Sequence, residues 1–224
     1  MASFDRVYWL SGSPCGGKTT VSDALAQRFG WNIYHVDEQW DSHKERATPE
    51  EHPTYHSITR VTGDELWLRP LEEQIRTEPI FVEEAFPLIR EDVKQLLAED
   101  DRPLIVDASV VPSSIKSILP SDNHIYYLIP SEEFQREQYA RRTFIKDVLA
   151  KTTDPEQAWS NWMARDVAFA RWLKDRVKEA ELPYLIVDGT ISLEATVDLI
   201  ASHYVGDNNK VHGSFAPWLK PLST

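Results

Sequence analysis

Three glycines, a lysine and two threonines are concentrated in one short stretch near the start of the chain, GSPCGGKTT at residues 12–20. An apolar run precedes the stretch, and a segment with helical periodicity follows it. Glycines let a backbone turn so tightly that successive N–H groups point at an anion, and a helix beginning there adds its positive dipole end. Gly12, Gly17, Lys18 and Thr19 match the pattern G-x-x-x-x-G-K-[ST], which predicts a loop that binds nucleotide phosphates.

We expect this loop to hold the phosphates of ATP. Lys18 should reach the β- and γ-phosphates as part of the catalytic machinery, and the Thr19 hydroxyl should bind Mg²⁺. Thr20 has no expected catalytic role, and Cys15 fills a position that the pattern leaves free. The loop residues expected to bind the nucleotide are Gly12, Ser13, Pro14, Cys15, Gly16, Gly17, Lys18, Thr19 and Thr20.

A second ligand for the magnesium ion is expected at the end of another strand. Asp107 directly follows the apolar run Leu104–Val106, which is typical of a buried strand. In open α/β sheets, ligands bind beside the carboxyl ends of the strands. We therefore expect Asp107 to join Thr19 at the metal; the alternative is an aspartate that caps the next turn.

Short apolar runs rich in β-branched and aromatic residues recur along the chain, separated mostly by helix-like sequence. This alternation predicts an α/β fold in which helices cover both faces of a parallel sheet. The expected strands are 7–10, 33–36, 104–106, 125–129 and 184–187. The expected helices are Lys18 to Phe29 with a stop at Gly30, one beginning at Ser131, one from about Glu156 to Ala180, and one from Ser192 to about His203.

Composition and charge exclude several classes of partner. The 224 residues, of which 42% are hydrophobic, are enough for one substantial core and few for two domains. A net charge of −12 repels phosphate backbones and anionic lipids, so neither nucleic acid nor a membrane is an expected partner. The chain has one cysteine, no apolar signal-peptide core and no run of about 18 apolar residues, so we expect a cytoplasmic protein.

The loop and the order of the elements resemble the small P-loop kinases, the adenylate-kinase-like superfamily of shikimate, gluconate and nucleoside monophosphate kinases and chloramphenicol phosphotransferase. The resemblance covers about residues 6–204, and the loop is its only highly specific motif. It implies a five-stranded parallel core in one domain at residues 1–204, a substrate-binding insertion at 38–90 and an arginine-bearing lid at 131–160. Residues 205–224 are expected to form an extended tail.

The resemblance implies a small-molecule phosphate acceptor beside Asp37, which follows the second expected strand. In similar kinases an acid here orients the acceptor hydroxyl or takes its proton; the alternatives are a capping aspartate or a role for Glu38 instead. We expect His35 to be packed. The segment 38–80 has weak helical periodicity interrupted by prolines such as Pro79. The residues that could line an acceptor pocket, or pack the core of the insertion instead, are Trp40, Tyr55, Trp67, Glu83, Glu84 and Phe86.

Arginines are expected to stabilise the charge that develops on the transferred phosphoryl group. Arg136, Arg141 and Arg142 lie where the resemblance places the start of the lid; the alternative is a solvated basic face paired with neighbouring glutamates. Arg165 shares a helical face with aromatic residues, where a charge must be paired, so we expect it to meet phosphate or a carboxylate. The resemblance implies a nucleotide-binding role for Arg136 and catalytic roles for Arg141 and Arg165. It also implies that Gly189 lies beside the adenine ring; the alternative is that its turn only leads into the next helix.

Together these patterns predict an ATP-dependent phosphotransferase that moves the γ-phosphoryl group of Mg–ATP to a hydroxyl or phosphate of a small molecule. The alternative, from another class, is a nucleotide-gated switch protein that hydrolyses ATP slowly or not at all. The sequence does not identify the acceptor.

Overall fold

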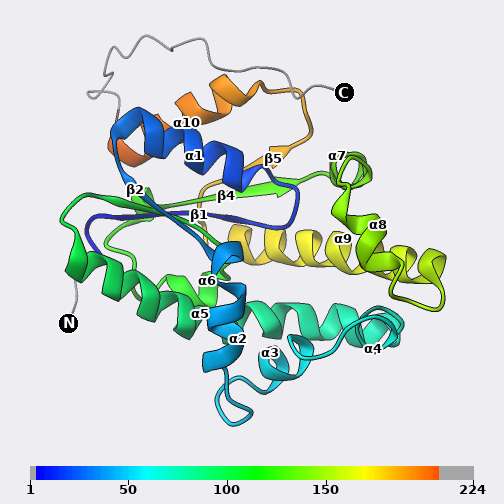
Figure 1. Ribbon diagram of the computed structural model, residues 1–224. Coiled ribbons are helices and arrows are strands. Elements are labelled where there is room, and N and C mark those ends of the chain that lie inside the picture. Colours follow the sequence, from blue (N-terminus) through cyan, green and yellow to red (C-terminus); the bar gives the residue numbers. More distant parts are fainter. Residues whose placement is uncertain (1–3, 207–224) are drawn as a thin grey trace.

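The computed structural model describes residues 4–206, in which five strands form one parallel sheet. The strand order is β2-β3-β1-β4-β5, and every neighbouring pair is parallel (Figure 1). The strands are β1 (Val7–Gly12), β2 (Asn32–His35), β3 (Leu104–Asp107), β4 (Ile125–Pro130) and β5 (Tyr184–Val187). The predicted fold class is therefore confirmed.

Helices cover both faces of the sheet, as predicted. On one face lie α1 (Lys18–Phe29) and α10 (Leu193–Val205); on the other lie α5 (Leu71–Glu99) and α9 (Pro155–Glu179) (Figure 1). Helix α1 has the predicted bounds and stops at Gly30, whose φ of 67° is the left-handed conformation that favours glycine. Because helices cover both faces, β3 and β4 are buried along their whole length and β1 is buried except at Tyr8, which explains the continuous apolar runs of these central strands.

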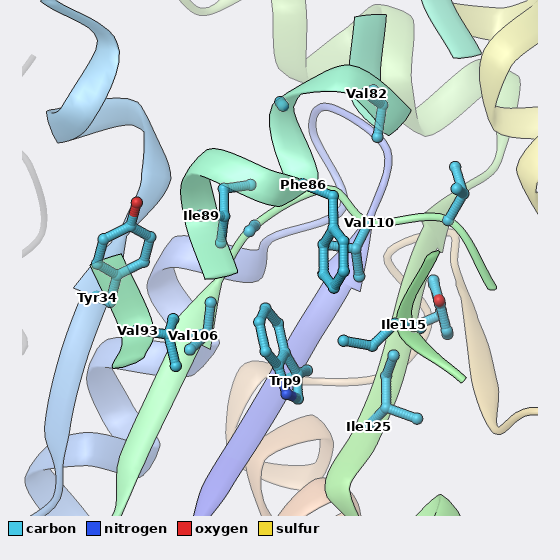
Figure 2. Packing of buried hydrophobic residues seen from close by; sticks show 14 of the residues in the cluster. Trp9, Tyr34, Val82, Phe86, Ile89, Val93, Val106, Val110, Ile115 and Ile125 are labelled. Atoms are coloured by element: carbon cyan, nitrogen blue, oxygen red, sulfur yellow. The ribbon is translucent and has the colours of Figure 1, made fainter. Parts of the chain in front are cut away.

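Side chains along the central strands alternate between two cores, one on each face. On β1, Trp9 enters the core beneath α5 and α9, whereas Leu10 enters the core shared with α1 and α10. In the larger core Phe86 and Ile89 of α5 lie against the sheet (Figure 2), and the rings of Trp9 and Phe86 are 5.9 Å apart. Fully burying a side chain of this size stabilises the fold by about 1.5–3 kcal/mol, so this packing holds α5 on the sheet.

The insertion after β2 is helical, as predicted, but its last helix extends further than expected. The prediction that Pro79 interrupts the helical pattern is wrong, because α5 runs without a break through Pro79 and Pro87. An internal proline costs about 3 kcal/mol or more. The core side chains of α5, at about 1.5–3 kcal/mol each, offset that cost. The elements before α5 are η1 (Val36–Gln39), α2 (Trp40–Arg46), α3 (Pro53–Ile58) and α4 (Asp64–Trp67).

Two serines begin helices where the sequence predicts them. The hydroxyl of Ser131 accepts a hydrogen bond from the N–H of Phe134, and that of Ser192 accepts one from the N–H of Ala195. The remaining helical elements are α6 (Pro112–Ile115), η2 (Asp122–His124), α7 (Glu132–Ala140) and α8 (Phe144–Leu149), of which the sequence predicted only the one that Ser131 begins, α7.

None of the helices within residues 4–206 combines the length and the apolar character needed to cross a membrane. The predicted extended tail lies outside the described residues, apart from Val205, which ends α10, and Gly206.

Candidate functional site

The loop that follows β1 lies where the strand order of the sheet reverses. It joins β1 to α1, and β1 lies between β3 and β4, so the loop occupies the carboxyl end of the central strand. Two of its glycines have no room for a side chain, because a Cβ on Gly12 would lie 1.8 Å from the Leu128 carbonyl oxygen and one on Gly16 would lie 2.5 Å from it. Gly17 caps α1 with a φ of 82°. The glycines therefore serve the tight backbone path that the motif predicts.

The other residues of the loop are held by α7 and α9. The carbonyl of Pro14 accepts a hydrogen bond of 2.9 Å from Gln135 Nε2. Cys15 belongs to a buried cluster with Tyr139 and Trp162, and burial raises the pKa of its thiol to about 11. The thiol is therefore protonated at neutral pH and acts as a small packing group, as its free position in the motif suggests.

The predicted metal ligands are brought into contact. Thr19 Oγ1 donates a hydrogen bond of 2.7 Å to Asp107 Oδ2 at the end of β3. Lys18 Nζ is folded back onto the loop and donates to the carbonyl of Ser13 at 3.2 Å. A hydroxyl and a carboxylate are oxygen ligands of the kind that Mg²⁺ prefers, and Mg²⁺ in nucleotide sites usually adds phosphate oxygens and water to one or two protein ligands. The side chains present therefore fit the predicted magnesium site.

A histidine that was expected from the sequence only to be packed holds the carboxylate of Asp107. His35 lies beside Asp107 in the register of β2 and β3. Its Nδ1 is 3.0 Å from Asp107 Oδ2, and its Nε2 is 3.1 Å from Asp23 Oδ1. Burial alone would lower the pKa of His35, but the hydrogen bond to Asp107 and the charges of both aspartates raise it above its usual value. From the sequence His35 was expected to be packed, and it is half-buried; its contacts with two carboxylates were not expected, because only strand register places it between them.

The glycine-rich loop and Asp107 lie at the wall of one cavity of about 270 Å³, which we call the loop cavity. Its walls are formed by Pro14, Cys15, Gly16, Gly17, Lys18, Thr19, Thr20, Val36, Asp37, Asp107, Ser109, Tyr139 and Arg142. The structure thus places the phosphate loop, the predicted metal ligands and Asp37 around one space. Gly12 and Ser13, also predicted to bind the nucleotide, are fully buried in the same turn.

A second, smaller cavity of about 130 Å³ opens beside the first, and we call it the aromatic pocket. Asp37, in the first turn of η1, lines both cavities, as do Pro14, Val36 and Ser109. The other residues of the aromatic pocket are Trp40, Tyr55, Glu78, Phe81, Val82, Ala85, Ile89 and Phe169. Asp37 therefore lies on the boundary between the phosphate loop and a pocket built largely by the insertion.

The predicted acceptor residues are only partly those that line this pocket. Trp40 and Tyr55 line it as expected. Trp67 instead stacks on Trp162 with ring centres 4.0 Å apart, and Phe86 packs against the sheet. Glu83 accepts from Ser113 Oγ, and Glu84 accepts from the N–H of Tyr55. The lining residues Glu78, Phe81 and Phe169 were missed, because only the packing of α5 against α9 turns them toward this space.

Two of the predicted lid arginines do not reach the loop cavity. Arg136 forms an ion pair of 3.0 Å with Glu132, and Arg141 forms one of 2.5 Å with Glu137. Both pairs have the i, i+4 spacing of neighbours on a helix surface, which is the alternative that the sequence left open. Their predicted placement at the phosphates is therefore not what the structure shows. Arg142 alone of the three lines the loop cavity, with its guanidinium 5.2 Å from the ring centre of Tyr139.

Arg165 is also not at the loop cavity, because carboxylates hold it in the interior. Its Nη2 is 2.7 Å from Asp166 Oδ1, and its Nε is 3.5 Å from Glu78 Oε2. The guanidinium lies 4.9 Å from the ring centre of Trp67. Of the two partners expected for Arg165, phosphate or a carboxylate, the structure shows the carboxylate. Its predicted catalytic contact is corrected accordingly.

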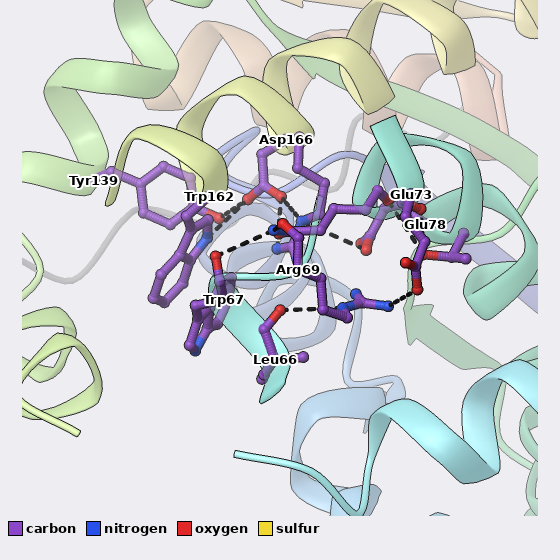
Figure 3. Close-up of polar contacts among 11 residues, drawn as sticks. Leu66, Trp67, Arg69, Glu73, Glu78, Tyr139, Trp162 and Asp166 are labelled. Atoms are coloured by element: carbon purple, nitrogen blue, oxygen red, sulfur yellow. Dashed lines mark hydrogen bonds and ion pairs between the residues drawn. The ribbon is translucent and has the colours of Figure 1, made fainter. Parts of the chain in front are cut away.

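Asp166 is the centre of this buried network. It accepts hydrogen bonds from the Tyr139 hydroxyl and from Trp162 Nε1, the latter at 3.1 Å, and Figure 3 shows both side chains converging on it. Burial raises the pKa of Glu78, although the charge of Arg165 acts in the opposite direction. The network joins α5, α7 and α9, and it reaches the wall of the loop cavity through Tyr139 and that of the aromatic pocket through Glu78.

Gly189 lies in the turn between β5 and α10. Its φ is 86°, and a Cβ there would meet two ring carbons of Phe134 at 3.3 Å. Asp188 Oδ1 accepts hydrogen bonds from the N–H and hydroxyl of Thr190, which closes the turn before Ser192. The structure accounts for this glycine by a helix-entry turn, and its place beside adenine stays a prediction.

The glycine-rich loop at the switch point of a five-stranded parallel sheet defines the class by its architecture: an α/β fold that carries the P-loop sequence motif between its central strand and the first helix. Solved structures that the chain resembles include the deoxyadenosine kinase of M. mycoides with bound dATP (13% identity, 88% of this chain and 97% of that chain covered, TM-score 0.47). The shikimate kinase of Acinetobacter baumannii in complex with shikimate is 16% identical over 92% of this chain and 95% of that chain, with a TM-score of 0.46.

A gluconokinase from Sinorhizobium meliloti 1021 is also similar, at 16% identity over 91% of this chain and 93% of that chain, with a TM-score of 0.44. No protein-family model matches the chain, and no curated protein matches it significantly. Sequence identities and TM-scores as low as these show similarity of fold only. The chemistry of the site therefore has to be inferred from the residues of this chain.

Proposed function

We propose that this protein is an ATP-dependent phosphotransferase that acts on a hydroxyl group of a small molecule. One observation carries the proposal: Asp37 lies on the boundary between the loop cavity and the aromatic pocket. A carboxylate at such a boundary faces the γ-phosphate on one side and an acceptor on the other. That is the position required for a group that orients or deprotonates an attacking hydroxyl.

The loop side of the site supplies binding and electrostatic stabilisation. The loop N–H groups and Lys18 hold the β- and γ-phosphates, and Thr19 and Asp107 hold Mg²⁺, with His35 orienting Asp107. When bound, Mg²⁺ supplies positive charge that neutralises the phosphate oxygens. Arg142 is the arginine placed to approach the transferred group, because it already lines the loop cavity.

The transfer itself needs few groups from the protein. The acceptor oxygen attacks the γ-phosphorus, the new O–P bond forms, and the bond from that phosphorus to the β,γ-bridging oxygen breaks so that ADP leaves. The acceptor proton passes to the carboxylate of Asp37, which releases it to solvent. Asp37 is exposed and lies at the wall of both cavities, so neither transfer of this proton is blocked.

The test compares wild type with Asp37→Asn in a steady-state assay of ADP release, with Mg–ATP and a panel of small alcohols. Loss of the carboxylate charge should lower kcat by about 10²–10⁴ for the best acceptor while ATP affinity measured by titration hardly changes. Asp41→Asn is the matched control, because Asp41 is an exposed acid of α2 that lines neither cavity.

The same assay separates the proposal from the alternative of a nucleotide-gated switch. If no alcohol raises ADP release above the rate without acceptor, and Asp37→Asn leaves that slow rate unchanged, the protein is not a phosphotransferase for alcohols. If acceptor-dependent turnover is intact in Asp37→Asn, another group handles the acceptor, and Glu38 is the next candidate.

A further inference from the structure

The aromatic pocket combines flat apolar surfaces with acidic groups. Tyr55 and Phe81 are stacked with ring centres 4.6 Å apart, and the ring of Trp40 lies 6.2 Å from each of them. Asp37 and Glu78 are the ionisable carboxyl groups of its wall. Among the described residues that line the pocket there is no lysine, arginine or histidine.

The charge of Arg165, the arginine next to Glu78 of the pocket wall, is already neutralised by protein carboxylates. Arg165 contacts Glu78, but it is also paired with Asp166 at 2.7 Å, so two carboxylates share one guanidinium. Its side chain is only 12% exposed and is covered by Trp67 on one face. An anionic ligand in the pocket would therefore meet the carboxylates of its wall without a counter-charge among the described residues that line the pocket.

The size of the pocket limits the ligand further. A cavity of about 150 Å³ lined by apolar side chains accommodates a benzene molecule. The aromatic pocket, at about 130 Å³, is of the same size and is also lined by aliphatic and aromatic groups such as Val82, Ala85 and Ile89. It has room for a single ring, and any further part of a ligand would extend out of the pocket.

We propose that the acceptor is an alcohol whose bound part is one apolar or aromatic ring, uncharged or bearing an amine, and carrying no carboxylate or phosphate. This inference rests on the proposed function, because it assigns the aromatic pocket to the acceptor. An amine is favoured by the charge of Asp37 and by the electron-rich aromatic rings of Trp40, Tyr55 and Phe81 in the pocket wall. A carboxylate or phosphate in the same place is repelled by that charge and loses its hydration without a partner.

Three alcohols of one scaffold test the charge preference: 4-methylbenzyl alcohol, 4-(aminomethyl)benzyl alcohol and 4-(hydroxymethyl)benzoate. Binding to the full chain is measured by ligand-observed NMR titration, and transfer is measured by ADP release with Mg–ATP. We expect the benzoate to bind at least about 10-fold more weakly than the other two, because like charges within about 10 Å repel this strongly at an effective dielectric constant of about 20.

A variant that fills the pocket shows where the probes bind. Ala85→Leu adds a larger side chain to the pocket wall and should abolish binding of the methyl and amine probes while Mg–ATP still binds. Ala98→Leu is the matched control, because Ala98 is an exposed residue of the same helix. Thermal unfolding of both variants verifies that they are folded. A second pocket-filling variant, Val82→Phe, replaces Ala85→Leu if the latter does not fold.

The outcomes separate this inference from the proposed function. Equal or tighter binding of the benzoate, binding that survives Ala85→Leu, or no binding of any probe would overturn the inference, even if other alcohols are phosphorylated. Pocket-dependent binding of the neutral and amine probes without any ADP release would support the pocket's preference and count against the phosphotransferase.

Discussion

Replacement of Arg165 by methionine should destabilise the protein strongly without removing a phosphate contact. The side chain is 12% exposed and pairs with Asp166, itself 1% exposed, and with Glu78. Methionine fills much of the same volume but leaves both carboxylates without their guanidinium. Breaking a buried ion pair by removing one partner typically costs about 3–5 kcal/mol, because an uncompensated charge stays buried.

This loss is large enough to be measured directly. In a chain of this length each kcal/mol lowers Tm by about 2–4 °C, so Arg165→Met should lower it by about 6–20 °C. Urea unfolding gives the free energy independently. Arg141→Met is the matched control: Arg141 is 66% exposed and pairs with Glu137 on a helix surface, so its loss should cost less than about 1 kcal/mol.

Catalytic measurements on the same variants complete the test. At a temperature where Arg165→Met is folded, its affinity for Mg–ATP should be close to that of wild type, because Arg165 does not line the loop cavity. The reasoning is refuted if Arg165→Met unfolds like wild type but loses more than about 10²-fold in kcat, since that result describes an arginine that contacts the transferred phosphoryl group.

Two further predictions concern the loop and the insertion. Lys18→Ala should keep the fold but lose most affinity for Mg–ATP and nearly all turnover, because backbone N–H groups do not replace its charge; calorimetric titration checks this, and wild-type affinity would exclude the phosphate role. Burial holds the pKa of His43 in the folded protein below its usual 6.5, although Asp92 favours the charged form. As pH falls, the unfolded chain therefore binds a proton at this histidine before the folded chain does. The free energy of unfolding should then decrease as pH falls below about 6.5. His43→Gln should flatten this part of the pH profile of unfolding by urea, and an unchanged slope would contradict the assignment.

The sequence by itself determined the features that depend on neighbouring residues. The loop pattern between an apolar run and an amphipathic segment was sufficient to place the glycine-rich loop and the bounds of α1. Ser131 and Ser192 were recognisable as helix starts, since a cap bonds to the third residue after it. Asp107 was predictable because a carboxylate at the end of a buried parallel strand lies at the ligand edge of the sheet.

Tertiary structure alone decided which distant groups meet. His35 contacts Asp107 only because β2 and β3 pair in the register that places the two residues side by side. The residue pattern of β2 does not predict that register. From the sequence, the partner of Arg165 could be either phosphate or a carboxylate. The packing of α5 against α9 places Glu78 beside Arg165, so the partner is a carboxylate. The aromatic pocket has the same origin: its walls come from η1, α2, α3, α5 and α9, and a cavity is a property of their packing that no local pattern encodes.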